Sequence, residues 1–134
     1  MSNFDIKNLE FIVKTTPEHV FNLLTDASLI SQWSGAPADF QLKVGGSYEM
    51  FGGWAKGKIN SFTVQSDLSY TWWITDWNDD TAPSTVNYHL EKHDQGTKVV
   101  LQHLNLPDQE SADSHKGGWS NEFFDLINEF LIDK

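Results

Sequence analysis

The sequence predicts an α+β fold in which an antiparallel sheet buries one face against a long C-terminal helix. Two patterns carry this prediction. Apolar and polar residues alternate with a period of two through most of residues 39–106, which is typical of half-buried strands. Apolar residues then recur at helical spacing from residue 114 to residue 132. The 134 residues contain no repeat, linker or low-complexity tract, so we expect a single domain over residues 1–134.

The N-terminal region predicts one strand followed by two short helices. Residues 8–14 are rich in β-branched and aromatic side chains, as strands are. Thr16 can cap the next helix, and Pro17 suits its first position. Asp26 is expected to cap a second short helix that carries Trp33 on its apolar side.

The middle of the chain predicts three strands separated by glycine turns and a polar loop. The second of these strands loses its alternation near Ser61 and Phe62, which indicates a bulge. We expect strands over 48–51, 56–65 and 68–74, turns at Gly45–Gly46 and Gly52–Gly53, and a loop over 76–83 that carries Trp77.

The last hairpin can be placed in register from its apolar residues. One register puts all the apolar residues of both strands on a single face, whereas a slip of one residue sets Val99 and Leu101 opposite polar side chains. Residues 93–96 then form the tip, with Gly96 in a left-handed conformation. The expected pairs are Leu90 with Val99, Tyr88 with Leu101, and Val86 with His103.

The C-terminal region predicts one long amphipathic helix over residues 114–132. Its polar residues, such as Glu122 and Asp125, fall on the side opposite the apolar stripe. The stripe consists of Trp119, Phe123, Leu126, Ile127, Phe130 and Leu131.

Charge and composition exclude several classes of function. The chain has 9 lysines and no arginine against 19 acidic residues, for a net charge of -10. Such a surface repels nucleic acid, and the missing arginine removes the usual bidentate clamp for phosphate. The chain has no cysteine, which excludes disulfides, thiolate metal sites and a cysteine nucleophile.

The hydropathy pattern predicts a cytoplasmic protein without membrane insertion. No apolar run approaches the roughly 18–20 residues that a membrane-spanning helix needs. The first residues, MSNFDIKNLEF, also lack the basic and apolar regions of a secretory signal.

The aromatic residues of the inner sheet face and of the helix form a candidate ligand cavity. Many rings with a few polar tips are typical of small-molecule sites. Gly117 and Gly118 would leave room at the cavity mouth. Alternatively, the rings simply fill a core and the glycines allow close backbone packing. The candidate residues are Trp33, Tyr48, Met50, Tyr70, Trp72, Tyr88, Leu101, His103, Trp119 and Phe123.

Two histidines are candidates for acid–base chemistry or for anchoring a ligand. The hairpin register places His103 on the apolar face, and His115 lies near the start of the helix. Histidine at such positions is more often a hydrogen-bonded core residue. No serine–histidine–acid spacing stands out, so we assign no catalytic residue.

The sequence predicts neither a metal nor a cofactor. His89, Glu91 and His93 share a strand face, but residues four apart in a strand are separated by about 13 Å, too far for one metal. We therefore expect a solvated strand face. The acidic loop with Asp76 and Asp79 lacks a calcium-loop pattern, and the glycines match no nucleotide-binding spacing.

Several short segments in a fixed order resemble those of a known family. They are Thr16–Phe21 (TPEHVF), Asp26 with Trp33, Gly45–Tyr48 (GGSY), Leu68–Trp72 (LSYTW), Gly96–His103 (GTKVVLQH) and His115–Trp119 (HKGGW). The chain resembles the family named after the activator of the heat-shock-protein-90 ATPase, within the START and birch-pollen-allergen-like helix-grip superfamily. The resemblance implies a curved sheet that wraps a C-terminal helix, with a cavity between them. The eukaryotic co-chaperone adds a separate domain, and we expect this chain to be the module alone.

Three functions fit these observations. The leading hypothesis is non-catalytic binding of a hydrophobic or aromatic small molecule, lipid or polyketide-like, by burial in the cavity. The first alternative is a protein-interaction module with a chaperone partner in the stress response, motivated by the acidic charge and by Trp73 and Trp77 as exposed anchors. The second alternative is an enzyme of the cyclase or dehydratase kind, which the superfamily also contains.

Overall fold

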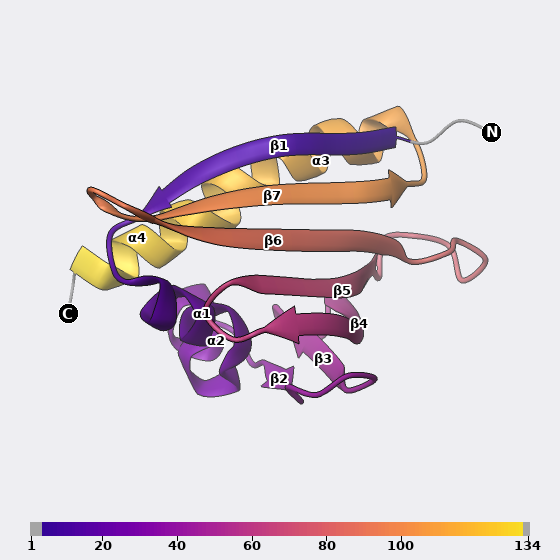
Figure 1. The fold of residues 1–134 in the computed structure, drawn as a ribbon. Helices are drawn as coiled ribbons and strands as arrows, with labels where there is room; N and C mark the ends of the chain where they lie inside the picture. The colour runs from indigo at the N-terminus through magenta and orange to yellow at the C-terminus, as the bar shows by residue number, and fades with distance from the viewer. Residues whose placement is uncertain (1–3, 133–134) are drawn as a thin grey trace.

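The computed structural model describes residues 4–132 and shows the predicted α+β architecture (Figure 1). Seven strands form a curved antiparallel sheet in the order β1-β7-β6-β5-β4-β3-β2, and the C-terminal helix lies across one face (Figure 1). Residues 1–3 and 133–134 of the expected domain lie outside the described range. The strands are β1 (Phe4–Val13), β2 (Asp39–Phe40), β3 (Ser47–Met50), β4 (Ala55–Thr63), β5 (Asp67–Ile74), β6 (Ser84–His93) and β7 (Gly96–Leu106).

Two short helices, α1 (Pro17–Thr25) and α2 (Ala27–Ser34), follow β1 as predicted. Thr16 accepts a hydrogen bond from the backbone N–H of His19 at 3.2 Å, which caps α1. Asp26 accepts from the N–H of Leu29 at 3.1 Å, which caps α2. Both cap predictions are confirmed. The pair packs against the sheet and against the end of the C-terminal helix.

The register predicted for the last hairpin is confirmed at all three pairs. Gly96 has a φ of 140°, and a Cβ atom there would lie 2.3 Å from the carbonyl oxygen of Val13. A glycine is therefore required because the end of β1 passes directly over the hairpin tip.

Strands β1 and β4 differ in detail from the prediction. The bulge in β4 lies between Ile59 and Ser61, just before the predicted position. Strand β1 begins at Phe4 rather than at residue 8, and its pairing with β7 shifts register twice before Leu9. Asn8 adopts a φ of 59° at this irregularity. The interrupted alternation hides the first part of the strand from periodicity analysis.

The C-terminal helix is longer than predicted and is interrupted. It comprises α3 (Gln109–Trp119), a π-helical turn η1 (Ser120–Phe124) and α4 (Asp125–Ile132). It begins five residues before the predicted residue 114, with Asp108 as the cap. The prediction, which relied on the apolar stripe, missed this start because the first turns of α3 are mostly polar.

The π-helical turn changes which residues the helix buries. An extra residue in a turn rotates the following helix about its axis. Phe123 and its neighbour Phe124 are consequently both buried, with 3% and 1% of their surface exposed. Phe124 stacks on Phe11 of β1 with ring centroids 4.3 Å apart. The regular helical spacing predicted Phe123 but not Phe124.

The core lies between the sheet and this helix. Strand β5 alternates between buried and half-buried residues over its full length, as predicted, with Tyr70 and Trp72 on the buried side. Within residues 4–132, no buried side-chain nitrogen or oxygen lacks a hydrogen-bond partner. None of the helices formed by these residues is long and apolar enough to cross a membrane.

Candidate functional site

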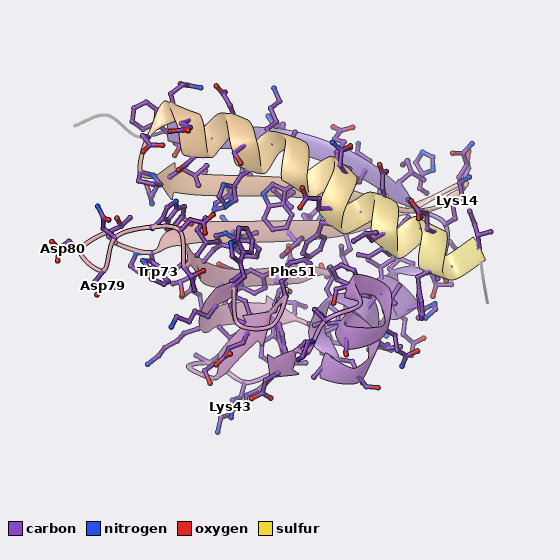
Figure 2. All side chains as sticks on the ribbon, turned by 180° about the vertical axis from the view of Figure 1, so that it is seen from behind. Lys14, Lys43, Phe51, Trp73, Asp79 and Asp80 are labelled. Carbon is purple, nitrogen blue, oxygen red and sulfur yellow. The ribbon has the colours of Figure 1, made fainter. Side chains whose placement is uncertain are left out.

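An aromatic cleft of about 450 Å³ opens between one end of the sheet and the middle of the C-terminal helix. Figure 2 is seen from the helix side, and Phe51 lies beside the helix in this view. Five aromatic rings line the cleft together with two carboxylates, a histidine and a glycine. The lining residues are Phe51 and Trp54 of the β3–β4 turn, Trp72 and Ile74 of β5, Asp76 of the following loop, Ser114, His115, Gly118 and Trp119 of α3, and Glu122 and Phe123 of η1.

The rings of the cleft pack on one another rather than standing alone. The centroid of Trp72 lies 5.0 Å from that of Trp119 and 6.3 Å from that of Trp54. Trp119 in turn lies 4.7 Å from Phe123. Such pairs are worth about 0.5–1.5 kcal/mol each beyond their buried area. The cleft therefore has fixed aromatic walls.

The turn that carries Phe51 and Trp54 has an unusual backbone. Phe51, Gly52 and Gly53 have successive φ angles of 56°, 67° and 93°. Glycine adopts such angles freely, whereas they cost phenylalanine about 1–2 kcal/mol. The Phe51 ring lies 6.2 Å from the rings of both Trp33 and Phe123. This packing holds Phe51 at the edge of the cleft despite the backbone strain.

His115 links the sheet to α3 through both ring nitrogens. Its Nδ1–H donates to the carbonyl oxygen of Ser111 at 2.8 Å, and its Nε2 accepts the indole N–H of Trp72 at 3.1 Å. These partners fix the neutral ring. Burial lowers the pKa of His115, while the bond to Ser111 and the nearby carboxylate of Asp76 partly oppose this shift.

His103 lies behind the cleft wall and positions Trp119. Its Nδ1 accepts the indole N–H of Trp119 at 3.1 Å, and its Nε2–H donates to the hydroxyl of Ser84 at 2.7 Å. The Ser84 hydroxyl donates onward to the carbonyl oxygen of Trp72 at 2.8 Å. Burial holds the pKa of His103 well below its usual value, and His115 lowers it further. Acid–base chemistry at either histidine would first require one of these bonds to break.

Of the ten residues predicted to line a cavity, the structure brings Trp72, Trp119 and Phe123 to the cleft. The other seven lie in the packed core and do not line this cleft: Trp33, Tyr48, Met50, Tyr70, Tyr88, Leu101 and His103. A role for these seven in binding stays a prediction.

The three core tyrosines bond within the protein. The hydroxyls of Tyr70 and Tyr88 share a hydrogen bond, and that of Tyr48 donates to the carbonyl oxygen of Thr71 at 2.6 Å. Burial raises the pKa of all three phenols above the usual value. Their polar ends therefore point to partners in the protein.

The two neighbouring glycines of α3 differ in their relation to the cleft. A Cβ atom added to Gly117 or to Gly118 would meet no atom within 4 Å, so neither glycine serves close backbone packing. Gly118 lines the cleft. Gly117 is exposed and does not line it. Of the two glycines expected at a cavity mouth, Gly118 therefore borders the cleft and Gly117 does not.

Several lining residues were missed, although some left a signal in the sequence. Ile74 shares the inner face of β5 with Trp72, so the alternation already placed it there. Glu122 follows His115 and Gly118 at helical spacing. Trp54 and Asp76 lie just outside strands, where neither the strand periodicity nor the helix periodicity predicts which residues are buried.

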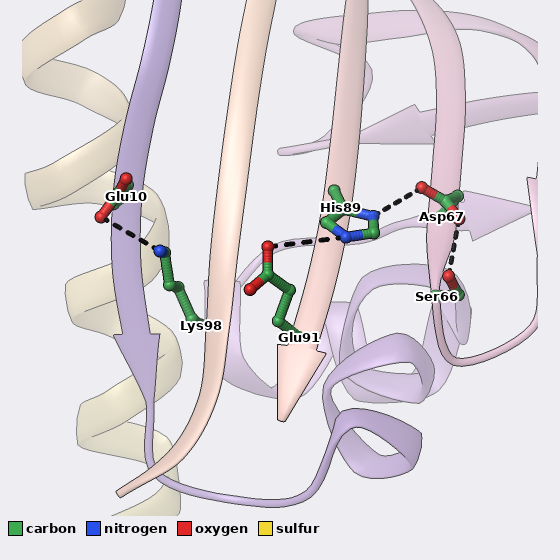
Figure 3. Close-up of polar contacts among 6 residues, drawn as sticks. All are labelled: Glu10, Ser66, Asp67, His89, Glu91 and Lys98. Atoms are coloured by element: carbon green, nitrogen blue, oxygen red, sulfur yellow. Dashed lines mark hydrogen bonds and ion pairs between the residues drawn. The ribbon is translucent and has the colours of Figure 1, made fainter. Parts of the chain in front are cut away.

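The residues weighed as metal ligands do not form a metal site. No group of three histidine, aspartate or glutamate side chains in the described range could hold an ion. His89 is half exposed on the outer face and lies between Asp67, at 2.9 Å, and Glu91, at 3.6 Å (Figure 3). The expectation of a solvated strand face is confirmed. A separate ion pair joins Lys98 to Glu10 at 3.7 Å (Figure 3).

Trp73 and Trp77, expected as exposed anchors, are both half-buried. Trp73 donates its indole N–H to the carbonyl oxygen of Thr81, and the ammonium of Lys56 lies 5.3 Å from its ring. Trp77 donates to the hydroxyl of Ser111 at 3.2 Å. This hydrogen bond joins the loop that carries Trp77 to α3.

The family model described as "Activator of Hsp90 ATPase homolog 1-like protein" matches residues 14–131. The chain belongs to this family. The matched range runs from the end of β1 into α4, so it contains every residue that lines the cleft.

Among curated family relatives are the proteins named "Activator of 90 kDa heat shock protein ATPase homolog 1" of Mus musculus and Homo sapiens. Each is 20% identical to the chain over 115 residues, or 86% of its length. The match covers 33% of each relative, so the chain spans about a third of their length.

Solved structures share the fold over nearly the whole chain. An HSP90 activator from Plasmodium falciparum is 29% identical with a TM-score of 0.80, and the match covers 98% of this chain and 96% of that one. Protein MLL2253 from Mesorhizobium loti is 23% identical with a TM-score of 0.81, covering 97% and 98%. CalU16 from Micromonospora echinospora is 20% identical with a TM-score of 0.74, covering 92% and 71%. The last two show the fold alone, which is the START-like helix-grip fold of this family.

Proposed function

We propose that the protein binds a hydrophobic or aromatic small molecule, lipid or polyketide-like, in the aromatic cleft. The observation that carries this proposal is the cleft itself, about 450 Å³ with walls formed by Phe51, Trp54, Trp72, Trp119 and Phe123. Ligand pockets in proteins usually measure about 300–1,000 Å³ and are mostly apolar with a few polar groups.

Binding would act by burial, without a chemical step. Each Å² of apolar ligand surface removed from water contributes roughly 25 cal/mol. The wall needs little rearrangement because the indole N–H groups of Trp72 and Trp119 are already bonded to His115 and His103. A wall held in place in advance loses less conformational entropy when a ligand binds.

The test is a titration followed by tryptophan fluorescence, since Trp54, Trp72 and Trp119 line the cleft. The panel consists of a fatty acid, a flavonoid, an anthraquinone and a protonated aromatic amine. We expect a saturable change with at least one probe. Gly118→Leu should abolish this change by filling the cleft. Gly117→Leu is the matched control, because it adds the same side chain one residue away, outside the cleft.

Two outcomes would contradict the proposal. One is a flat response to every probe by protein whose circular dichroism shows it to be folded. The other is equal binding by the Gly118→Leu and Gly117→Leu variants, which would place the bound probe elsewhere.

A second candidate function is interaction with a chaperone. Its support is the family, together with the name of the Plasmodium falciparum relative, an HSP90 activator that matches 98% of this chain. We expect the purified protein to bind purified Hsp90 in isothermal titration calorimetry and to raise its ATPase rate. Absence of both effects at saturating protein would reject this candidate while leaving the small-molecule proposal untouched.

A further inference from the structure

The charged groups of the aromatic cleft are of one sign. Asp76 and Glu122 line it, and among residues 4–132 no lysine does. The remaining titratable group, His115, is held neutral by burial and by its two hydrogen bonds. The chain as a whole carries a net charge of -10 and contains no arginine. A cation is therefore attracted both at long range and inside the cleft, whereas an anion is repelled.

Three hydrogen-bond donors of the cleft walls are already used within the protein. The indole N–H groups of Trp72 and Trp119 point to His115 and His103. The single N–H of the neutral His115 ring donates to the carbonyl oxygen of Ser111. An anionic or strongly accepting ligand group would find these donors occupied. These three side chains are only 2–8% exposed, so the aromatic surface open to a ligand is mainly that of the half-buried Phe51 and Trp54.

The rings meet at steep angles, as in aromatic cages. The planes of the half-buried Phe51 and Trp54 rings are inclined at 79°, with their centroids 6.1 Å apart. Rings set at such angles form a corner, and corners of this kind hold ammonium groups through the negative face of the ring. The carboxylates of Asp76 and Glu122 stand at the exposed part of the same cleft.

We propose that the ligand of the cleft is an organic cation, a quaternary ammonium or protonated amine carried on an apolar or aromatic body. This inference rests on the proposed function and narrows its ligand class. The apolar body is buried against the rings. The cationic group lies against the half-buried rings of Phe51 and Trp54 and is neutralised by Asp76 and Glu122.

The experiment compares three benzyl compounds that differ in charge. They are benzyltrimethylammonium, its uncharged carbon isostere neopentylbenzene, and the anion phenylacetate. Affinities are measured by tryptophan fluorescence and calorimetry at low and at physiological salt. We expect the cation to bind about tenfold more tightly than the isostere, as cation–π contacts and two carboxylates allow. We expect the anion to bind more weakly than both.

Charge-removing variants test which groups supply the preference. Asp76→Asn and Glu122→Gln should each lower the ratio of cation to isostere affinity by about threefold or more. Glu129→Gln is the matched control. It removes an exposed carboxylate from α4, farther along the same helix, that does not line the cleft. This variant should leave the ratio unchanged.

The outcomes separate this inference from the proposed function. If the isostere or the anion binds as tightly as the cation, the cation preference is wrong while small-molecule binding stands. If Glu129→Gln lowers the ratio as much as Asp76→Asn does, overall charge supplies the preference and the placement of the cation beside the cleft carboxylates is wrong. If none of these probes, nor the fatty acid, flavonoid, anthraquinone and aromatic amine, binds to the folded protein, both proposals fail.

Discussion

The indole N–H of Trp72 donates to Nε2 of His115 across 3.1 Å, and this bond joins strand β5 to helix α3 at the wall of the aromatic cleft. Only 2% of Trp72 and 8% of His115 are exposed. Water therefore cannot readily replace either partner, and the bond contributes to both the stability of the fold and the shape of the cleft.

Replacing His115 by leucine should destabilise the protein by about 1–3 kcal/mol, because the indole N–H of Trp72 is left buried without an acceptor. The free energy of unfolding is measured by urea denaturation. Trp72→Phe removes the donor instead. The double variant should lose less than the sum of the two single losses, and simple additivity would show that the two residues are not coupled.

Stability should fall below about pH 6.5, the usual histidine pKa. Burial lowers the pKa of His103 and His115 in the folded protein. Between the lowered values and about 6.5 the unfolded chain binds more protons, so acid favours unfolding. Above this range both rings are neutral in both states and the effect disappears.

The pH effect is measured by urea denaturation at pH 7.5, 6.5 and 5.5. Each histidine contributes a slope of at most about 1.4 kcal/mol per pH unit. His103→Gln and His115→Gln should each flatten the slope between pH 6.5 and 5.5. Constant stability across the three conditions would show that the histidines keep their usual pKa on folding.

The fold was predictable where short-range patterns decide it. The caps at Thr16 and Asp26 depend on residues three positions away, and both formed as predicted. The register of β6 and β7 depends on which face is apolar, and only one register keeps His103 and Leu101 on that face. Phe124 was missed because the π-helical turn breaks the period of 3.6 on which the prediction relied.

The site could be predicted only in part, because periodicity shows which face is buried but not where space remains on it. Tyr70 and Trp72 lie on the same face of β5. The rings of two other tyrosines pack against Tyr70, whereas Trp72 lines the cleft. The difference arises from the β3–β4 turn and the middle of the C-terminal helix, which come from other parts of the chain. No local pattern in β5 contains that information.

Gly96→Ala should destabilise the protein by about 2–4 kcal/mol. The new methyl group would lie 2.3 Å from the carbonyl oxygen of Val13, and alanine disfavours a φ of 140°. Gly45→Ala is the control, since Gly45 has a φ of 82° but no atom within 4 Å of the added Cβ. It should cost only the backbone strain, about 1–2 kcal/mol. Equal losses in denaturation would contradict the close approach of β1 to the hairpin tip.

The tyrosines should remain un-ionised at pH values where free tyrosine titrates. The chain has 3 tyrosines, and burial raises the pKa of Tyr48, Tyr70 and Tyr88 above the usual value of about 10. Below this value all three phenols are protonated in both states, and the stability due to their burial is complete. Above it the unfolded chain loses protons first, so this stability declines as the pH rises.

Phenolate absorbance near 295 nm, recorded together with circular dichroism from pH 9 to 12, measures this titration. We expect the absorbance of all three residues to rise only as the fold is lost, in one transition. Tyr88→Phe should move that transition to lower pH, because it leaves the buried hydroxyl of Tyr70 without its partner and weakens the fold. A rise near pH 10 with the circular dichroism unchanged would instead show that at least one phenol reaches solvent, and that the tyrosines are not sealed in the core behind the cleft.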